Sequence, residues 1–128
     1  MLTDTQRQRF DDVLDRVVGD LPSELRVLLD EVPLIVEDEP ARSLIRELDI
    51  DPQTTELCGL HSGVPLTHRS VQHSYRLPDQ MMLFRGPILR LAGRRRLLLV
   101  RQVRITLLHE MGHHFGLDED DLARLGYG

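Results

Sequence analysis

The sequence predicts a single domain, residues 1–128, in which several helices combine with a few short strands. Apolar residues recur at helical spacing in residues 5–18 and again over the long stretch 94–115. Three short apolar runs, at 34–36, 57–61 and 80–84, are typical of strands. A chain of 128 residues fits one domain and is long enough to bury a core without disulfides.

The remaining elements follow from the turn and breaker residues between these segments. The first helix should end at Gly19. The further elements expected are a second helix with Pro22 in its first turn, a short helix over 41–48, a loop over 64–78 and one helical turn over 88–92. Gly86 and Pro87 predict a break in the chain before that last turn.

The segment 94–115 is the longest expected helix, and its apolar residues spread over more than half of its circumference. They are Leu97, Val100, Ile105, Leu107, Leu108, Met111 and Phe115. So wide an apolar surface predicts a helix packed in the middle of the domain. The remaining sector carries Gln102, Thr106, His109 and His113, which fall within about 60° of one another. A polar stripe on such a helix should face a cleft.

Within this helix, residues 109–113 read H-E-x-x-H, a pattern typical of zinc peptidases. His109 and His113 lie one turn apart on the same face, so their imidazoles can bind one metal ion. Glu110 lies on the flank of that face, where it can serve as general base toward a zinc-activated water. The competing interpretation is a helix whose histidines bind no metal.

The residues after the motif suggest a third metal ligand. Gly116 stands where the helix should end, in the position of a left-handed cap. Four acids follow: Asp118, Glu119, Asp120 and Asp121. The spacing H-E-x-x-H-x-x-G-x-x-acid resembles that of the metzincins and Asp-zincins, whose third ligand stands ten residues after the first histidine. Glu119 is at that position and is the favoured ligand, with Asp118 as N-cap of a final helix; Asp118 remains the alternative ligand.

The chain closely resembles the small bacterial zincin-like metallopeptidase family. The resemblance covers residues 34–40, 59–70, 77–80, 83–87 and the motif helix with its His-His-Phe-Gly ending. It implies an α+β zincin-like domain, with a small sheet packed on a central motif helix and helices around it. It also implies a zinc metallopeptidase that binds one zinc ion per chain through His109, His113 and Glu119.

Three departures from the family pattern limit what can be transferred. Members often have tyrosine and glutamate where this chain has His61 and Ser62, so no role of that tyrosine carries over. The third-ligand position is commonly aspartate and here is Glu119. No methionine follows Met111, so the methionine turn beneath the metal of true metzincins is absent.

Composition restricts the partners and the compartment. The net charge of −5 argues against a nucleic-acid binder, and no apolar run approaches the roughly 20 residues that a membrane span needs. The single cysteine, Cys58, and a polar N-terminus predict a cytoplasmic protein. Seven arginines precede the motif: Arg85, Arg90, Arg94, Arg95, Arg96, Arg101 and Arg104. We expect a solvated helix face there, with an anion or partner site as the alternative.

Together these patterns favour a zinc-dependent hydrolase of peptide or protein substrates, with Glu110 as the base. The alternatives are a non-catalytic binding module on the same scaffold and a hydrolase of another amide. Substrate and oligomeric state stay open, although a peptide could pair with the edge of the strand at 80–84. The secondary candidates are His61, His68 and His73 as polar or substrate-contacting residues, Tyr75 and Tyr127 as oxyanion donors or packing residues, His114 beside the site, and Cys58 in the core.

Overall fold

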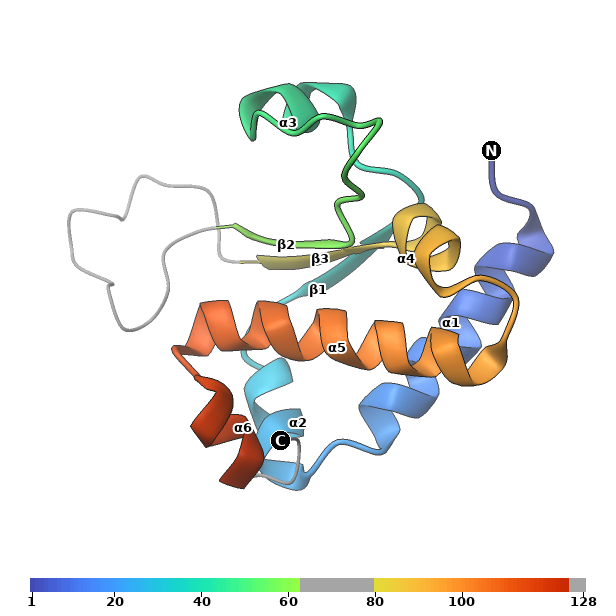
Figure 1. Ribbon diagram of the computed structural model, residues 1–128. Helices are drawn as coiled ribbons and strands as arrows, with labels where there is room; N and C mark the ends of the chain where they lie inside the picture. Colours follow the sequence, from blue (N-terminus) through green and yellow to red (C-terminus); the bar gives the residue numbers. More distant parts are fainter. Residues whose placement is uncertain (63–79, 125–128) are drawn as a thin grey trace.

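The computed structural model describes residues 1–62 and 80–124 (Figure 1). The helices in these residues are α1 (Asp4–Gly19), α2 (Ser23–Leu29), α3 (Arg42–Glu47), α4 (Arg85–Ala92), α5 (Arg96–Phe115) and α6 (Glu119–Arg124). The strands are β1 (Leu34–Glu37), β2 (Gly59–Ser62) and β3 (Gln80–Phe84). The predicted helices and strands are therefore confirmed, with ends that shift by a few residues. Two details differ: Pro22 is the N-cap residue before α2 and not part of its first turn, and the single turn expected over 88–92 is the eight-residue helix α4. The loop expected over 64–78 lies wholly outside the described residues.

The three strands form one mixed sheet in the order β1-β3-β2. β1 runs parallel to β3, with Leu34 opposite Met81, and β2 runs antiparallel to β3, with Gly59 opposite Leu83. β3 is thus the central strand and pairs on both sides. The expectation that a peptide could pair with the edge of residues 80–84 is wrong, because both edges of β3 are already used. In the sheet that the structure describes, β2 and β1 are the edge strands.

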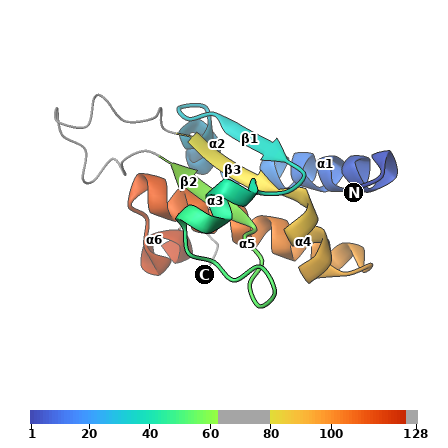
Figure 2. The same ribbon diagram turned by 90° about the horizontal axis from the view of Figure 1, so that it is seen from above.

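Helix α5 runs beneath the sheet, and α1 crosses beside it, while α3 lies on the opposite face of the sheet (Figures 1 and 2). The core fills the space between α1, α5 and the sheet. Its largest fully buried side chains include Phe10, Leu25, Met81, Leu83, Phe84, Ile88, Leu99, Leu107 and Met111. This arrangement, with the small sheet packed on the motif helix, is the predicted α+β architecture.

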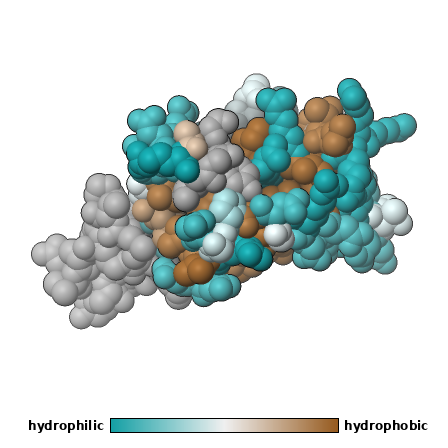
Figure 3. All heavy atoms as spheres, turned by 90° about the horizontal axis from the view of Figure 1, so that it is seen from below, coloured by the Kyte–Doolittle hydropathy of each residue, from teal (hydrophilic) through white to brown (hydrophobic). Residues whose placement is uncertain are grey.

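The apolar surface of α5 is less completely covered than the sequence suggested. Leu97 is 73% exposed and Ile105 is 49% exposed, although both were expected inside the domain. Leu99 and Val103 are buried in their place. The sheet, α1 and α4 pack against α5 on the sides that carry Leu99 and Val103, so Leu97 and Ile105 stay exposed. Viewed from below, Figure 3 shows hydrophobic atoms at the surface between hydrophilic ones.

Gly86 and Pro87 do not break the chain, contrary to the prediction. Both lie in the first turn of α4, which begins directly after β3. Proline is tolerated there because the N–H groups of a first helical turn have no partner within the helix. The strand therefore continues without a loop into the helix, and Pro87 is buried.

Two of the seven clustered arginines are tied into ion pairs. Arg85 contacts Asp11 at 2.9 Å and Asp38 at 3.1 Å, which links α4 to α1 and to the end of β1. Arg90 binds two glutamates, described below. The other five arginines are exposed and form no ion pair with any described residue, as a solvated face predicts. No helix in residues 1–62 and 80–124 is both long and apolar enough to cross a membrane.

Candidate metal centre

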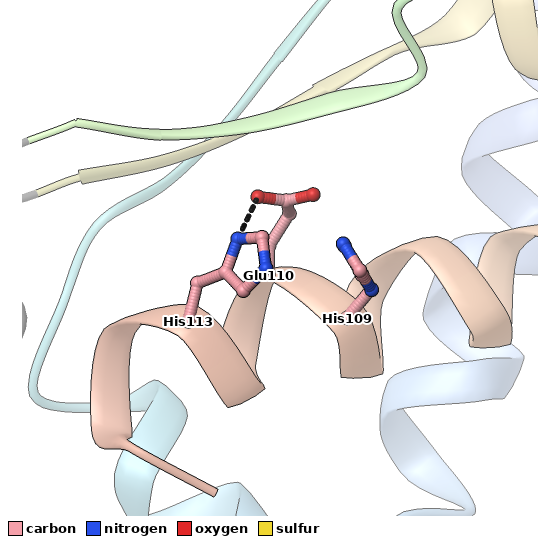
Figure 4. A group of neighbouring side chains, drawn as sticks. All are labelled: His109, Glu110 and His113. Carbon is pink, nitrogen blue, oxygen red and sulfur yellow. Dashed lines mark ion pairs between the residues drawn. The ribbon is translucent and has the colours of Figure 1, made fainter. Parts of the chain in front are cut away.

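The last two turns of α5 bring His109, Glu110 and His113 together (Figure 4). One potential ligand atom from each of the three lies within 4.8 Å of the others. The rings of His109 and His113 meet edge to face with centroids 4.3 Å apart. His113 Nδ1 lies 3.7 Å from Glu110 Oε1. The one-turn spacing of the histidines thus places both imidazoles side by side, as the sequence predicts.

The three side chains differ in their exposure. His109 and His113 are exposed, whereas Glu110 is only 6% exposed and lies beneath the sheet. Burial raises the pKa of the Glu110 carboxyl, because the charged form loses its hydration. The neighbouring His113 and His109, and a backbone hydrogen bond from His61, act in the opposite direction on that pKa. The site therefore joins two solvent-facing imidazoles to one sheltered carboxylate.

Strand β2 covers Glu110 because Gly59 has no side chain. A Cβ on Gly59 would lie 2.9 Å from Thr106 Cγ2, 3.1 Å from Glu110 Cγ and 3.1 Å from the Met82 carbonyl oxygen. Such distances are too short for a real side chain to be accommodated without movement. The glycine thus permits the close approach of strand and helix that buries Glu110.

A histidine pair next to the centre was not foreseen. His114, 3% exposed, lies one residue after His113, and its Nδ1 is 2.6 Å from Nε2 of His61 in β2. The two rings also meet edge to face, with centroids 4.6 Å apart. His114 lies beside the site as expected, whereas His61 is more than an ordinary polar residue because its ring contacts His114. Nothing in the sequence pairs these residues, because they are distant in the chain and their contact depends on how β2 crosses α5.

The end of α5 is shaped by two glycines. Gly116 adopts the left-handed conformation with φ 70° and ψ 29°, as predicted for a helix cap. The N–H of Leu117 then donates to the carbonyl of Gly112 at 3.0 Å. A Cβ on Gly112 would lie 2.9 Å from the Leu117 carbonyl oxygen. Both glycines are therefore needed for the chain to reverse tightly over the motif.

The acids after Gly116 divide into two groups. Asp118 Oδ1 accepts a hydrogen bond from the Asp121 N–H at 2.8 Å, and Asp121 Oδ2 accepts one from the Asp118 N–H at 3.0 Å. This reciprocal pair confirms Asp118 as the N-cap of α6. It also lowers the pKa of the Asp118 carboxyl, since the hydrogen bonds favour its charged form. Glu119 and Asp120 are exposed, and Glu119 lies outside the group of three potential ligands.

Of the remaining candidates, Cys58 lies in the described residues and does not join this centre. Cys58 is partly buried against the core, and burial with the nearby Glu56 raises the pKa of its thiol to about 11. Such a thiol is protonated at neutral pH and is a poor nucleophile. Four further candidates, His68, His73, Tyr75 and Tyr127, lie outside the described residues.

The donor set fits a transition-metal ion. His109 and His113 offer two imidazole nitrogens, which zinc commonly takes in proteins, and a third protein ligand would still leave a position open for reaction. His109 and His113 are solvent-facing, so an ion can enter without movement of the core.

The comparisons with known proteins agree with this chemistry. The model of one protein family, described as zincin-like metallopeptidase, matches residues 29–128 and so spans all three strands, the motif helix and α6. No curated protein matches the chain. Since the match covers most of the sequence, the chain belongs to the zincin-like metallopeptidase family.

Proposed function

We propose that this protein is a zinc-dependent peptide hydrolase in which Glu110 is the general base. His109 and His113 would hold the zinc ion, with Glu119 as the third ligand. The observation that carries the proposal is the position of Glu110, a buried carboxylate beside two exposed imidazoles. A structural metal site needs only ligands, whereas a hydrolase also needs a proton acceptor next to them.

The assignment of roles follows from burial and hydrogen bonding. When bound, zinc would lower the pKa of a water molecule and polarise the substrate carbonyl. Glu110 would accept the proton from the attacking water, and burial supports this role because it raises the pKa of the carboxyl toward the working pH. The backbone N–H of His61 would hold the carboxylate in place while it exchanges that proton.

Glu119 is proposed as third ligand from its spacing to His109 and from the capping roles of two of its neighbours. Both Asp118 and Asp121 use their carboxylates to cap α6. Glu119 is the first residue of that helix and stands ten residues after His109. Its carboxylate has no hydrogen bond or ion pair with another described residue, so it is available to a metal ion.

Strand β2 is the proposed docking edge for the substrate. It lies at the edge of the described sheet and passes directly over Glu110. An extended peptide that pairs with this edge would bring its backbone next to the metal-binding side chains, as in other cases of strand addition.

The deciding experiment combines metal analysis with cleavage of an unbiased peptide library. Zinc-loaded wild-type protein should cleave some peptides, and Glu110→Gln should retain zinc and fold while its turnover falls roughly 10²–10⁴-fold. Glu24→Gln in α2 is the matched control, since it removes an exposed carboxylate outside the centre. Zinc binding without any cleavage would instead favour a non-catalytic binding module.

A further inference from the structure

A cavity lies outside the metal centre, against α3 and the segment that leads from it to β2. Its volume is about 570 Å³, within the range of cavities that bind small molecules. In Figures 1 and 2, α3 lies over β2, and the following segment descends beside α4 to the start of that strand. The apolar part of the lining consists of Pro40, Ile45, Ile50, Pro52 and Leu57.

The lining of the cavity also contains three arginines, of which one is paired with carboxylates and two are not paired with any described residue. Arg90 contacts Glu39 at 2.8 Å and Glu56 at 2.5 Å, so these three charges largely satisfy one another. Arg42 and Arg46 also line the cavity, one helical turn apart on α3. Both are exposed, and neither forms an ion pair or a side-chain hydrogen bond with any residue of 1–62 or 80–124. The cavity therefore combines an apolar wall with two unpaired guanidinium groups, which suits an apolar group that carries a carboxylate.

The cavity adjoins the metal centre through the start of β2. Leu57 lines the cavity, and Gly59, two residues later, lies against Glu110. Two extended residues span about 7 Å. The thiol of Cys58, between them, is influenced by Glu56 and Arg90 of the cavity and also by Glu110 of the centre. A peptide paired with β2 would thus reach the cavity about two residues beyond Glu110.

We propose that this cavity binds the carboxyl-terminal residue of a peptide substrate, with an apolar side chain against Ile45 and Ile50 and the terminal carboxylate on Arg42 and Arg46. The charge also sets the direction of the peptide. The unpaired arginines attract a carboxyl terminus and repel an amino terminus, so the peptide runs antiparallel to β2. The inference rests on the proposed function only in calling the bound peptide a substrate, because binding to the cavity does not require cleavage.

The test measures peptide binding to the Glu110→Gln variant, which should not turn the peptide over. Three fluorescently labelled hexapeptides of otherwise equal sequence are compared: one ends in leucine with a free carboxylate, one ends in leucine amide, and one ends in glycine with a free carboxylate. The leucine acid should bind roughly tenfold or more tightly than either of the others. Adding Arg42→Gln and Arg46→Gln should abolish the advantage of the acid over the amide. Ile50→Ala should reduce the advantage of leucine over glycine.

The matched control adds Arg96→Gln and Arg104→Gln, two exposed arginines of α5 outside the cavity. This control removes the same charge and should leave the preference for the free acid intact. Equal binding of acid and amide, or an equal loss in both double variants, would overturn the proposal. An amidated peptide with glutamate at its last position that binds as tightly as the leucine acid would also overturn the assignment to a terminus. Failure of the proposed function alone gives a different result. Wild-type protein would then cleave no peptide, while Glu110→Gln would still prefer the leucine acid.

Discussion

Nε2 of His61 in β2 lies 2.6 Å from Nδ1 of His114 in α5, and this contact ties the edge strand to the motif helix. The same strand residue donates its backbone N–H to Glu110, and His114 directly follows the proposed ligand His113. This pair of rings therefore joins the strand that lies over the proposed base to the turn of α5 that carries the proposed ligand His113. A shift of β2 would remove the hydrogen bond to Glu110.

We predict that His61→Ala and His114→Ala are energetically coupled. Each loses the ring contact, so the double variant should be less destabilised than the sum of the single variants, by about 0.5–3 kcal/mol. Urea unfolding of all four proteins measures this coupling. A control cycle of His114→Ala with the exposed Asp15→Ala should be additive within about 0.5 kcal/mol. Additivity in the His61 cycle as well would mean that the contact stabilises nothing.

Zinc content should depend on both exposed histidines of the motif. Protein purified without chelator should contain close to one zinc per chain, and His109→Ala or His113→Ala should lose most of it, because a site with two ligands binds zinc weakly. Metal analysis after dialysis measures the content. Gln102→Ala, two turns before His109 on the same side of α5, should keep its zinc. An unchanged metal content in both histidine variants would refute the site.

Two substitutions distinguish the residue that binds zinc from the residue that caps α6. Glu119→Ala should weaken zinc binding strongly without much loss of stability, since its exposed side chain makes no contact that holds the fold. Asp118→Ala should instead cost about 1 kcal/mol of unfolding free energy in the metal-free protein, because it removes the cap of α6. Zinc titration and denaturant unfolding measure the two effects, with Asp120→Ala as the control. If the effects are reversed, Asp118 is the ligand.

Gly59→Ala in β2 should disturb Glu110, which lies against this strand in α5. The added methyl group would meet Thr106, Glu110 and the Met82 carbonyl at 2.9–3.1 Å, so strand and helix must separate. We expect a loss of about 1–3 kcal/mol of stability, typical of overpacking, together with reduced turnover. Gly19→Ala is the matched control, since a Cβ there has nothing within 4 Å. Equal stability of the two variants would show that β2 is not held closely against Glu110.

The sequence by itself determined the features that depend on neighbours along the chain. The spacing of His109 and His113 places their rings together in any regular helix, because residues four apart share a face. The left-handed turn at Gly116 and the cap at Asp118 likewise follow from local backbone and side-chain hydrogen bonds. The strand at Gln80–Phe84 was found at its full length, since turn residues precede it and apolar side chains fill it.

Only the tertiary structure decided which elements lie next to the motif. Nothing in the sequence shows that β3 is central and β2 is the edge strand, because pairing depends on residues far apart in the chain. The exposure of Leu97 and Ile105 depends on how far the sheet and α1 cover α5, which helical periodicity does not contain. Glu110 is buried, and His61 meets His114, because Gly59 lets β2 approach the helix closely. The motif thus supplies the reactive groups, and the long-range packing of one edge strand gives them their environment.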